Sequence, residues 1–232
     1  MVGTTKSPEE GAGEPALRIA FDPVAFIREN MRLEPVRMIE EISLYTAHPG
    51  SGLRRLLDGE GEDDSAPYWA YAWAGGAALA RYMLDRPESV EGRRVLDLGT
   101  GSGLVAIAAA KAGACEVLAV DIDRIGIAAL ALNAVANGVE IDAMHGDLLD
   151  GPPPGVDVVV IGDLFYEADL AERVTAFLDA CLDMGIRVLV GDPGRAFLPR
   201  ARLRKLAEYA VPDFGRTHST GVVPSEVFAF ER

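Results

Sequence analysis

The segment Val95–Gly103, with the sequence VLDLGTGSG, decides the fold of this 232-residue chain. Its first four residues are mostly apolar, which is typical of a short buried strand. The Ala-rich segment from Ser102 to Ala112 is typical of a helix. The loop between them holds three glycines, Gly99, Gly101 and Gly103. Because glycine lets a backbone turn sharply and approach a ligand closely, we predict a strand, a binding loop and a helix.

Strands and helices continue to alternate after this loop. Further apolar runs predict strands at 116–120, 139–143, 157–161 and 187–190. The segments between them predict helices at 124–137 and 168–184. This alternation is typical of a mostly parallel sheet with helices on both faces. We therefore predict a doubly wound α/β domain, followed by a hairpin within 217–230.

The N-terminal part of the chain has a different character. Residues 1–16 are polar, so we interpret them as a disordered tail and not as a signal or transit peptide. Apolar residues recur at helical spacing from Asp22 to Tyr45 and predict one or two helices. We thus expect a helical extension at 17–66 before the α/β domain at 67–232, in a cytoplasmic protein. That domain begins with a further predicted helix, from Trp69 to Leu84, which ends before a proline.

The composition disfavours several classes of function. The chain has 36 acidic and 22 basic residues, a formal charge of −14. A nucleic-acid binder normally carries a basic face, so nucleic acid is not the expected partner. The charge suits a basic partner surface, although solubility alone also explains it. Two cysteines and three dispersed histidines give neither a disulfide scaffold nor metal-ligand spacing, so we expect no metal. The longest apolar stretch ends at Lys111, far short of the roughly 20 residues of a membrane span.

The glycine spacing separates two possible cofactors. A dinucleotide fingerprint places its glycines at positions i, i+2 and i+5. Here the third glycine comes at i+4, and Leu104 follows it. Asp97 stands two residues before the first glycine, where a pyrophosphate has no use for a carboxylate but an ammonium group does. The sequence therefore predicts a site for S-adenosylmethionine, which carries an amino group, and not for NAD.

Two further acids end predicted strands and complete this site. Asp121 follows the second strand, where a carboxylate can accept hydrogen bonds from both ribose hydroxyls. Asp147 follows the third strand, where it can accept a hydrogen bond from the adenine amino group. The residues predicted to contact the cofactor on these grounds are Asp97, Gly99, Thr100, Gly101, Gly103, Asp121, Ile122, Asp147 and Leu148.

From about Pro67 onward the sequence resembles the class I (seven-β-strand) S-adenosylmethionine-dependent methyltransferases. This resemblance implies seven strands, the last one antiparallel and reached through a hairpin. Three blocks, PYWAYAWAGG at 67–76, IGDLFYEADL at 161–170 and VGDPGR at 190–195, resemble the lysine methyltransferases of the electron transfer flavoprotein β subunit. The resemblance implies methyl transfer to lysines of that subunit, with S-adenosylhomocysteine as the second product. The vertebrate members are mitochondrial and carry a targeting segment, so a bacterial member is implied here.

The resemblance also implies roles for residues after the fourth strand. An acid-x-x-Tyr/Phe motif follows that strand in the wider group of lysine methyltransferases, and Asp163-Leu-Phe-Tyr166 matches it. We predict Asp163 and Tyr166 as catalytic residues, the first orienting the lysine amine and the second facing its positive charge. The residues predicted to bind the substrate are Phe165, Glu167 and Asp192. The resemblance further implies that Trp73 lines the cofactor pocket.

Structural roles stay open for most of these residues. Asp163 could cap the following helix, and the two aromatic residues beside it could serve packing alone. Glu167 also fits a solvated helix start, and Asp192 fits a structural turn. Trp69 and Trp73 would share one face if their segment were helical, which is equally typical of a core pair.

Other functions remain as alternatives to methylation of the flavoprotein. The acceptor could be another protein, such as a ribosomal protein, or a small amine. The chain could also hold the cofactor without transferring its methyl group, or bind a dinucleotide after all. Methylation of nucleobases or of glutamine is disfavoured, because no Asn-Pro-Pro-Tyr motif follows the fourth strand.

Overall fold

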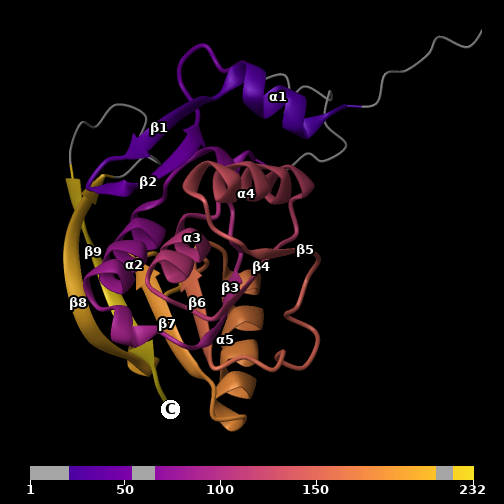
Figure 1. The fold of residues 1–232 in the computed structure, drawn as a ribbon. Coiled ribbons are helices and arrows are strands. Elements are labelled where there is room, and N and C mark those ends of the chain that lie inside the picture. Colours follow the sequence, from indigo (N-terminus) through magenta and orange to yellow (C-terminus); the bar gives the residue numbers. More distant parts are fainter. Residues whose placement is uncertain (1–20, 54–65, 213–221) are drawn as a thin grey trace, which may run out of the picture.

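The computed structural model describes residues 21–53, 66–212 and 222–232. A seven-stranded sheet forms its centre, in the strand order β5-β4-β3-β6-β7-β9-β8 (Figure 1). The strands are β3 (Arg94–Leu98), β4 (Glu116–Asp121), β5 (Asp142–His145), β6 (Val158–Gly162), β7 (Arg187–Asp192), β8 (Leu203–Pro212) and β9 (Val222–Phe230). The first five are parallel, and β9 runs antiparallel to both β7 and β8. The predicted doubly wound sheet with an antiparallel last strand is confirmed.

The order of the strands places the binding site. The chain leaves β3 for β4 on one side and later returns to place β6 on the other side of β3. Helices that leave neighbouring strands in opposite directions open a crevice at the carboxyl ends of those strands. The loop that follows β3 is the glycine loop, so it lies at this crevice.

Helices cover both faces of the sheet, because alternate strand residues point in opposite directions. Val95, Val158 and Val160 belong to a core with the helices α2 (Ala74–Asp85) and α3 (Leu104–Lys111). Leu96, Val159 and Ile161 belong to a second core on the other face, with α5 (Ala168–Asp183). The fourth helix, α4 (Arg124–Asn137), matches its predicted bounds. Its limits are set by Asp123, which caps its first turn, and by Gly138, which ends it in a left-handed conformation.

The N-terminal extension is only partly helical, so the prediction of one or two helices over 22–45 is half wrong. A helix, α1 (Pro23–Asn30), is followed by a hairpin of β1 (Arg32–Val36) and β2 (Ile39–Thr46). In β2 the apolar side chains at 39, 42 and 44 are buried, while the glutamates at 40 and 41 are exposed. This spacing fits a half-buried strand as well as a helix, and the turn at Met38, with a φ of 69°, decides for the hairpin.

The hairpin lies beside α4 (Figure 1) and is attached to it through two asparagines of that helix. The Oδ1 atom of Asn137 accepts the N–H of Ser43 at 3.0 Å, and its Nδ2 donates to the carbonyl of the same residue at 2.7 Å. Asn133 accepts the N–H of Tyr45 at 2.8 Å. It is fully buried and also donates to the carbonyl of Ser102, in the glycine loop, at 2.8 Å. The extension is therefore hydrogen-bonded, through one side chain, to the loop that follows β3.

Two other expectations change in detail. The helix predicted from Trp69 to Leu84 is split into a 3-10 turn (Tyr68–Ala70) and α2, because the backbone is extended at Tyr71 and Trp73. The C-terminal hairpin pairs β8 with β9 and so starts well before 217, while residues 213–221 lie outside the described part. Two further 3-10 turns cover Pro87–Ser89 and Arg200–Arg202.

The N-terminal tail and a possible membrane span remain to be compared with the fold. The predicted tail at 1–16 lies outside the described residues. Within the described residues, none of the helices has the length and apolar character needed to cross a membrane.

Candidate functional site

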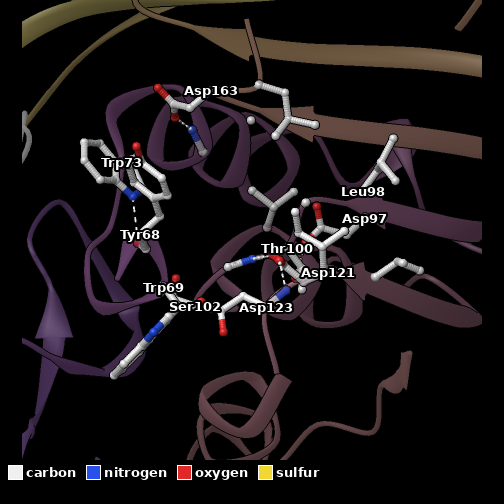
Figure 2. A pocket seen from close by; sticks show the side chains of 18 of the residues that line it. Tyr68, Trp69, Trp73, Asp97, Leu98, Thr100, Ser102, Asp121, Asp123 and Asp163 are labelled. Carbon is white, nitrogen blue, oxygen red and sulfur yellow. Dashed lines mark hydrogen bonds between the residues drawn. The ribbon is translucent and has the colours of Figure 1, made fainter. Parts of the chain in front are cut away.

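A pocket of about 450 Å³ opens at the carboxyl ends of β3, β4 and β6. Its walls come from the loops that follow the parallel strands and from the segment before α2 (Figure 2). Most residues predicted to contact the cofactor line it: Asp97, Gly99, Thr100, Gly101, Asp121, Ile122, Asp147 and Leu148. Trp73, Asp163 and Tyr166 line the same pocket. The structure thus brings the predicted cofactor residues and the predicted catalytic pair together.

Asp97 is a buried carboxylate at the floor of this pocket. Its side chain is 1% exposed, and its Oδ2 atom accepts hydrogen bonds from the Thr100 hydroxyl at 2.6 Å and the Ala106 N–H at 3.0 Å. No donor among the described residues reaches Oδ1 within hydrogen-bond distance. Burial raises the pKa of Asp97 to about 7, because desolvation outweighs these hydrogen bonds. A positively charged group in the pocket would stabilise the ionised form, which fits the ammonium of the predicted cofactor.

Asp121 is held against the glycine loop at the end of β4. Its Oδ2 atom accepts the N–H of Gly101 at 2.7 Å, and its Oδ1 atom accepts the N–H of Asp123 at 2.9 Å. Burial raises the pKa of this carboxyl, although the backbone hydrogen bonds oppose the shift. Each carboxylate oxygen retains a lone pair, so the fixed side chain can still accept hydrogen bonds from ligand hydroxyls.

Gly103 is the one predicted cofactor residue that does not line the pocket, and its role is to let α3 start. Its φ is 83°, a left-handed conformation that glycine adopts without strain, and it forms the N-cap of that helix. A Cβ atom at this position would lie 2.4 Å from the Cδ1 atom of Leu130 in α4. This glycine therefore allows the loop to turn and α4 to pack directly against it.

The third acid is more exposed than the other two and is engaged by a residue that the sequence analysis did not identify. Asp147 accepts the N–H of Leu149 at 2.9 Å and pairs with Arg173 of α5 at 2.8 Å. Arg173 also lines the pocket. Ile122 lines the pocket with 66% of its surface exposed, and Leu148, the residue after Asp147, lines the pocket as well. An exposed apolar side chain beside polar loops is suited to cover a flat ring.

Asp163 has an unusual backbone and two different partners. Its φ is 62°, which is uncommon for a residue other than glycine. The Oδ2 atom accepts the N–H of Gly76, in the first turn of α2, at 2.8 Å. The Oδ1 atom accepts hydrogen bonds from Nε and Nη2 of Arg195 at 3.1 and 2.5 Å. Burial raises the pKa of this carboxyl to about 6, against the opposing effect of Arg195.

A close approach of two backbones makes the contact with Gly76 possible. A Cβ atom on Gly75 would lie 2.3 Å from the carbonyl oxygen of Gly191 and 2.7 Å from Oδ2 of Asp163. A Cβ atom on Gly162 would lie 2.8 Å from the Cα of Gly76. Glycines at these positions let the start of α2 rest directly on the ends of β6 and β7. Asp163 therefore caps α2 and not the helix that follows it in sequence.

Aromatic rings line the part of the pocket around Asp163. We call this part, formed by Tyr68, Trp73, Asp163, Tyr166 and Arg195, the acceptor half. The ring centroid of Tyr68 lies 5.7 Å from those of Trp73 and Tyr166. The indole N–H of Trp73 donates to the carbonyl of Tyr68 at 2.8 Å (Figure 2). Burial raises the pKa of the Tyr166 phenol, which keeps it protonated. The guanidinium carbon of Arg195 lies 5.7 Å from the Trp73 ring centroid. Tyr68 and Arg195 were not predicted as site residues.

Other predicted residues lie outside the pocket. Phe165 is fully buried in the core beside α5, so the structure supports the packing alternative for it and not direct substrate contact. Glu167 precedes the first turn of α5 and does not line the pocket. Trp69 does line the pocket, but its side chain is almost fully buried in a core cluster with residues of α1 and α4, and this cluster does not include Trp73. These placements differ from the predictions because the segment before α2 is not helical and because β6 turns sharply at Asp163.

Asp192 is also absent from the pocket wall but supports a residue that lines it. It is fully buried at the end of β7, and its Oδ1 atom accepts the N–H groups of Gly194 and Arg195, both at 2.7 Å. This is the structural turn that the sequence left open as an alternative. Asp192 fixes the backbone from which the Arg195 side chain reaches Asp163.

The described residues thus fit S-adenosylmethionine. Asp97 offers an unused carboxylate oxygen to an ammonium, Asp121 can accept hydrogen bonds from ribose hydroxyls, and Ile122 with Leu148 can cover an adenine ring. Within the described part of the chain, no group of three or more His, Cys, Asp and Glu side chains could hold a metal ion.

Comparisons with known proteins place this geometry in a family context. The family model described as ribosomal protein L11 methyltransferase (PrmA) matches residues 78–168. The chain is 41% identical to the electron transfer flavoprotein beta subunit lysine methyltransferase of Rattus norvegicus over 172 residues, or 72% of this chain and 68% of the relative. It is 42% identical to the protein of the same name from Xenopus laevis over 171 residues, or 71% and 70%.

Solved structures show the same fold. The 16S rRNA N2 G1207 methyltransferase of T. thermophilus, solved with AdoMet and guanosine, superposes with a TM-score of 0.51 at 24% identity. The superposition covers 70% of this chain and 44% of that one. A likeness at this level of identity supports the fold and carries no information on the acceptor.

Proposed function

Because the chain belongs to the family of electron transfer flavoprotein β subunit lysine methyltransferases, we propose that it methylates lysine side chains of the flavoprotein β subunit in its own cell. The methyl donor is S-adenosylmethionine, and the second product is S-adenosylhomocysteine. The acceptor is a protein, and neither nucleic acid nor a metal takes part in the reaction.

One observation carries this proposal: a buried carboxylate, Asp163, lines the same pocket as the glycine loop. A pocket for the cofactor alone would need only Asp97, Asp121 and their loops. An additional acid beside aromatic rings supplies what an incoming lysine ammonium requires, namely a counter-charge and a wall for its methylene chain.

Each residue has a defined task in the reaction. When bound, S-adenosylmethionine supplies a methyl group that is already activated by a sulfonium. The protein therefore mainly has to align the two reactants and exclude water. Asp97 and Asp121 hold the donor, while Asp163 holds the lysine nitrogen and Tyr166 and Trp73 enclose its chain.

The lysine must also lose a proton before it can react. A free lysine has a pKa of about 10.4 and enters as an ammonium. Asp163 binds it in that form by charge, the proton leaves to water, and the nitrogen keeps its lone pair directed into the pocket. Tyr166 stays neutral, because burial raises the pKa of its phenol, and so does not add a second negative charge.

Ribosomal protein L11 is the second candidate acceptor, because the matching family model bears its name. That match ends at residue 168 and so covers the glycine loop and Asp163 but not Asp192 or Arg195. The matched region mainly forms the part of the pocket around the glycine loop, which different methyltransferases share. The flavoprotein relatives match over a longer part of the chain, with 41% identity over 172 residues, and this longer match favours the flavoprotein as the acceptor.

A substrate comparison tests the proposal. The purified protein is incubated with methyl-labelled S-adenosylmethionine and either the flavoprotein or ribosomal protein L11 of the same organism. We expect label only in the β subunit, located on lysine by mass spectrometry, and none with the Asp163→Asn variant. Label in L11 alone would refute the proposed acceptor, and no label in any protein of a cell extract would favour a cofactor-binding role.

A further inference from the structure

Arg195 occupies the position on Asp163 that an acceptor ammonium needs. Two N–H groups of its guanidinium, at Nε and Nη2, converge on the single oxygen Oδ1 at 3.1 and 2.5 Å. The other oxygen, Oδ2, accepts the N–H of Gly76. The Asp163 carboxylate is 8% exposed, whereas the Arg195 side chain is 24% exposed. The more accessible partner of this ion pair is thus the arginine.

The backbone and side chain of Arg195 are held differently. Asp192 fixes the backbone through the N–H groups of residues 194 and 195. The guanidinium lies over Trp73, at 5.7 Å from the ring centroid, in the pocket itself. The long side chain can therefore change its contact with Asp163 while its backbone stays in place and the indole remains a partner.

A lysine ammonium cannot simply be added to this arrangement. Lysine offers three N–H donors and a full positive charge, and the contact it requires is a carboxylate oxygen. Oδ2 is turned toward α2, and Oδ1 already carries a guanidinium. Two cations on one partly desolvated oxygen repel each other, so one of them has to give way.

We propose that Arg195 is a built-in competitor of the substrate amine, which leaves Oδ1 of Asp163 when the target lysine enters and so selects for lysines presented by a docked protein. This inference rests on the proposed function. Before substrate binds, the guanidinium keeps Asp163 paired. The exchange has a free-energy cost, which the remaining contacts of a docked protein can offset and a small free amine cannot. Arg195 is thereby a specificity-determining residue that acts through Asp163.

Kinetics on two acceptors test this role. The acceptors are the flavoprotein β subunit and n-butylamine, which carries only the amine and the methylene chain of a lysine. The variants are Arg195→Met, Arg195→Lys and, as the matched control, Arg202→Met. Arg202 is as exposed as Arg195, pairs with Asp179 and does not line the pocket. Rates are measured at about pH 9, above the pKa expected for a carboxyl group, so that Asp163 stays ionised.

We expect Arg195→Met to raise kcat/KM for n-butylamine about tenfold, mainly through a lower KM, because the acceptor site no longer has to be vacated. Its kcat/KM for the β subunit should change less, so that discrimination against the small amine falls. Arg195→Lys keeps a competing cation and should retain most of the discrimination against n-butylamine, whereas Arg202→Met should behave as the wild type does. If Arg195→Met instead lowers kcat/KM for both acceptors equally, the ion pair is structural and the inference is wrong.

A direct measurement covers the case in which Arg195→Met does not fold. Wild-type protein with ¹⁵N-labelled arginine, saturated with S-adenosylhomocysteine, gives an Nε–H signal for Arg195, identified by its absence in Arg195→Lys. Adding the β subunit should shift or broaden this signal, and n-butylammonium should do so only at a far higher concentration. An unchanged signal at saturation overturns the inference, whether or not the β subunit is methylated. Absence of methylation with a shifted signal would refute the proposed acceptor alone.

Discussion

The carboxylate of Asp163 accepts a hydrogen bond from the backbone N–H of Gly76 at 2.8 Å, across 87 positions of sequence. Gly76 lies in the first turn of α2, where backbone N–H groups lack partners within the helix. Trp73 is the N-cap residue and provides no side-chain cap there. A predicted catalytic acid is thus also the cap of a helix, and substitutions of it will affect both activity and stability.

The variants Asp163→Asn and Asp163→Ala should separate these two effects. Asparagine removes the charge but keeps an oxygen for Gly76, so we expect kcat/KM to fall by at least about 100-fold. Alanine also removes the cap and should cost about 1 kcal/mol more of unfolding free energy. Activity assays and urea unfolding measure the two quantities. Equal activity of Asp163→Asn and wild type would contradict the assigned role, provided that calorimetry shows unchanged cofactor binding.

The contact between α2 and the sheet predicts a strong effect at Gly75. An added methyl group would lie 2.3 Å from the carbonyl oxygen of Gly191, which is backbone and cannot rotate away. We expect Gly75→Ala to lower the unfolding free energy by about 1–3 kcal/mol and to reduce activity by displacing α2 from Asp163. Gly155→Ala is the control, because the nearest atom there is 3.8 Å away, at the end of an arginine side chain. Similar stability of the two variants would show that α2 can move without penalty.

Because the carboxyl of Asp97 is buried, we expect cofactor binding to weaken in acid. Burial raises the pKa of this carboxyl to about 7 in the ligand-free protein, and only the ionised form attracts an ammonium. Protonation therefore competes with binding, and the dissociation constant should rise about tenfold between pH 8 and pH 6. Isothermal titration calorimetry across this range measures it. In Asp97→Asn the affinity should be low and lose most of this pH dependence; retention of the full dependence would assign it to another group.

The raised pKa of Asp97 has the opposite effect on the stability of the ligand-free protein, which should be higher in acid. The folded-state pKa of Asp97 lies above the unfolded value of 3.8, so the folded state binds more protons between the two. The contribution of Asp97 to stability is therefore fully present below about pH 4 and is lost as the pH rises through about 7. Comparing the melting temperatures of wild type and Asp97→Asn between pH 5 and 8 isolates this contribution. The difference between them should grow with pH in favour of the variant.

We expect the hydroxyl group and the ring of Tyr166 to contribute differently to kcat and KM. The residue is 43% exposed and contacts Tyr68 through its ring. Tyr166→Phe keeps the ring but removes the phenol oxygen, the atom of this residue that could accept a hydrogen bond from the reacting amine. We therefore expect kcat to fall about tenfold with little change in KM. Tyr166→Ala removes the wall as well and should also raise KM for the protein acceptor. A wild-type kcat in Tyr166→Phe would reduce the role of this residue to enclosure of the lysine chain.

Much of the fold follows from local sequence signals, but the acceptor half of the site does not. The glycine loop and α4 could be predicted because their signals lie within a few residues: Asp123 before the helix, Gly138 after it, and Asp97 beside the glycines. The hairpin at 32–46 was missed because Ile39 and Ile42 are spaced as on a helix, whereas the turn at Met38, their burial in the core with α2 and α3, and the hydrogen bonds of Ser43 to α4 define β2 as a strand. Local spacing carries no information on that packing.

The contacts of Asp163 with Arg195 and Gly76 could not be predicted from the sequence for a different reason. Arg195 follows β7 and Gly76 precedes β6 by more than eighty residues, so both contacts depend on which strands and helices become neighbours. The motif Asp163–Tyr166 identified a functional acid by its resemblance to a family. It did not indicate that this acid would be paired with an arginine. Similarly, Phe165 belongs to the matched motif, but the sharp turn at Asp163 directs it into the core.

The hydrogen bonds of Asn133 bear on how the chain can be shortened in practice. One fully buried amide links the Tyr45 N–H in the hairpin to the Ser102 carbonyl in the glycine loop. A version trimmed to begin at α2 would leave the Oδ1 atom of that amide without its donor, next to the glycine loop. Expression and crystallisation designs should therefore retain the N-terminal hairpin, even though the Rossmann-type sheet is complete without it.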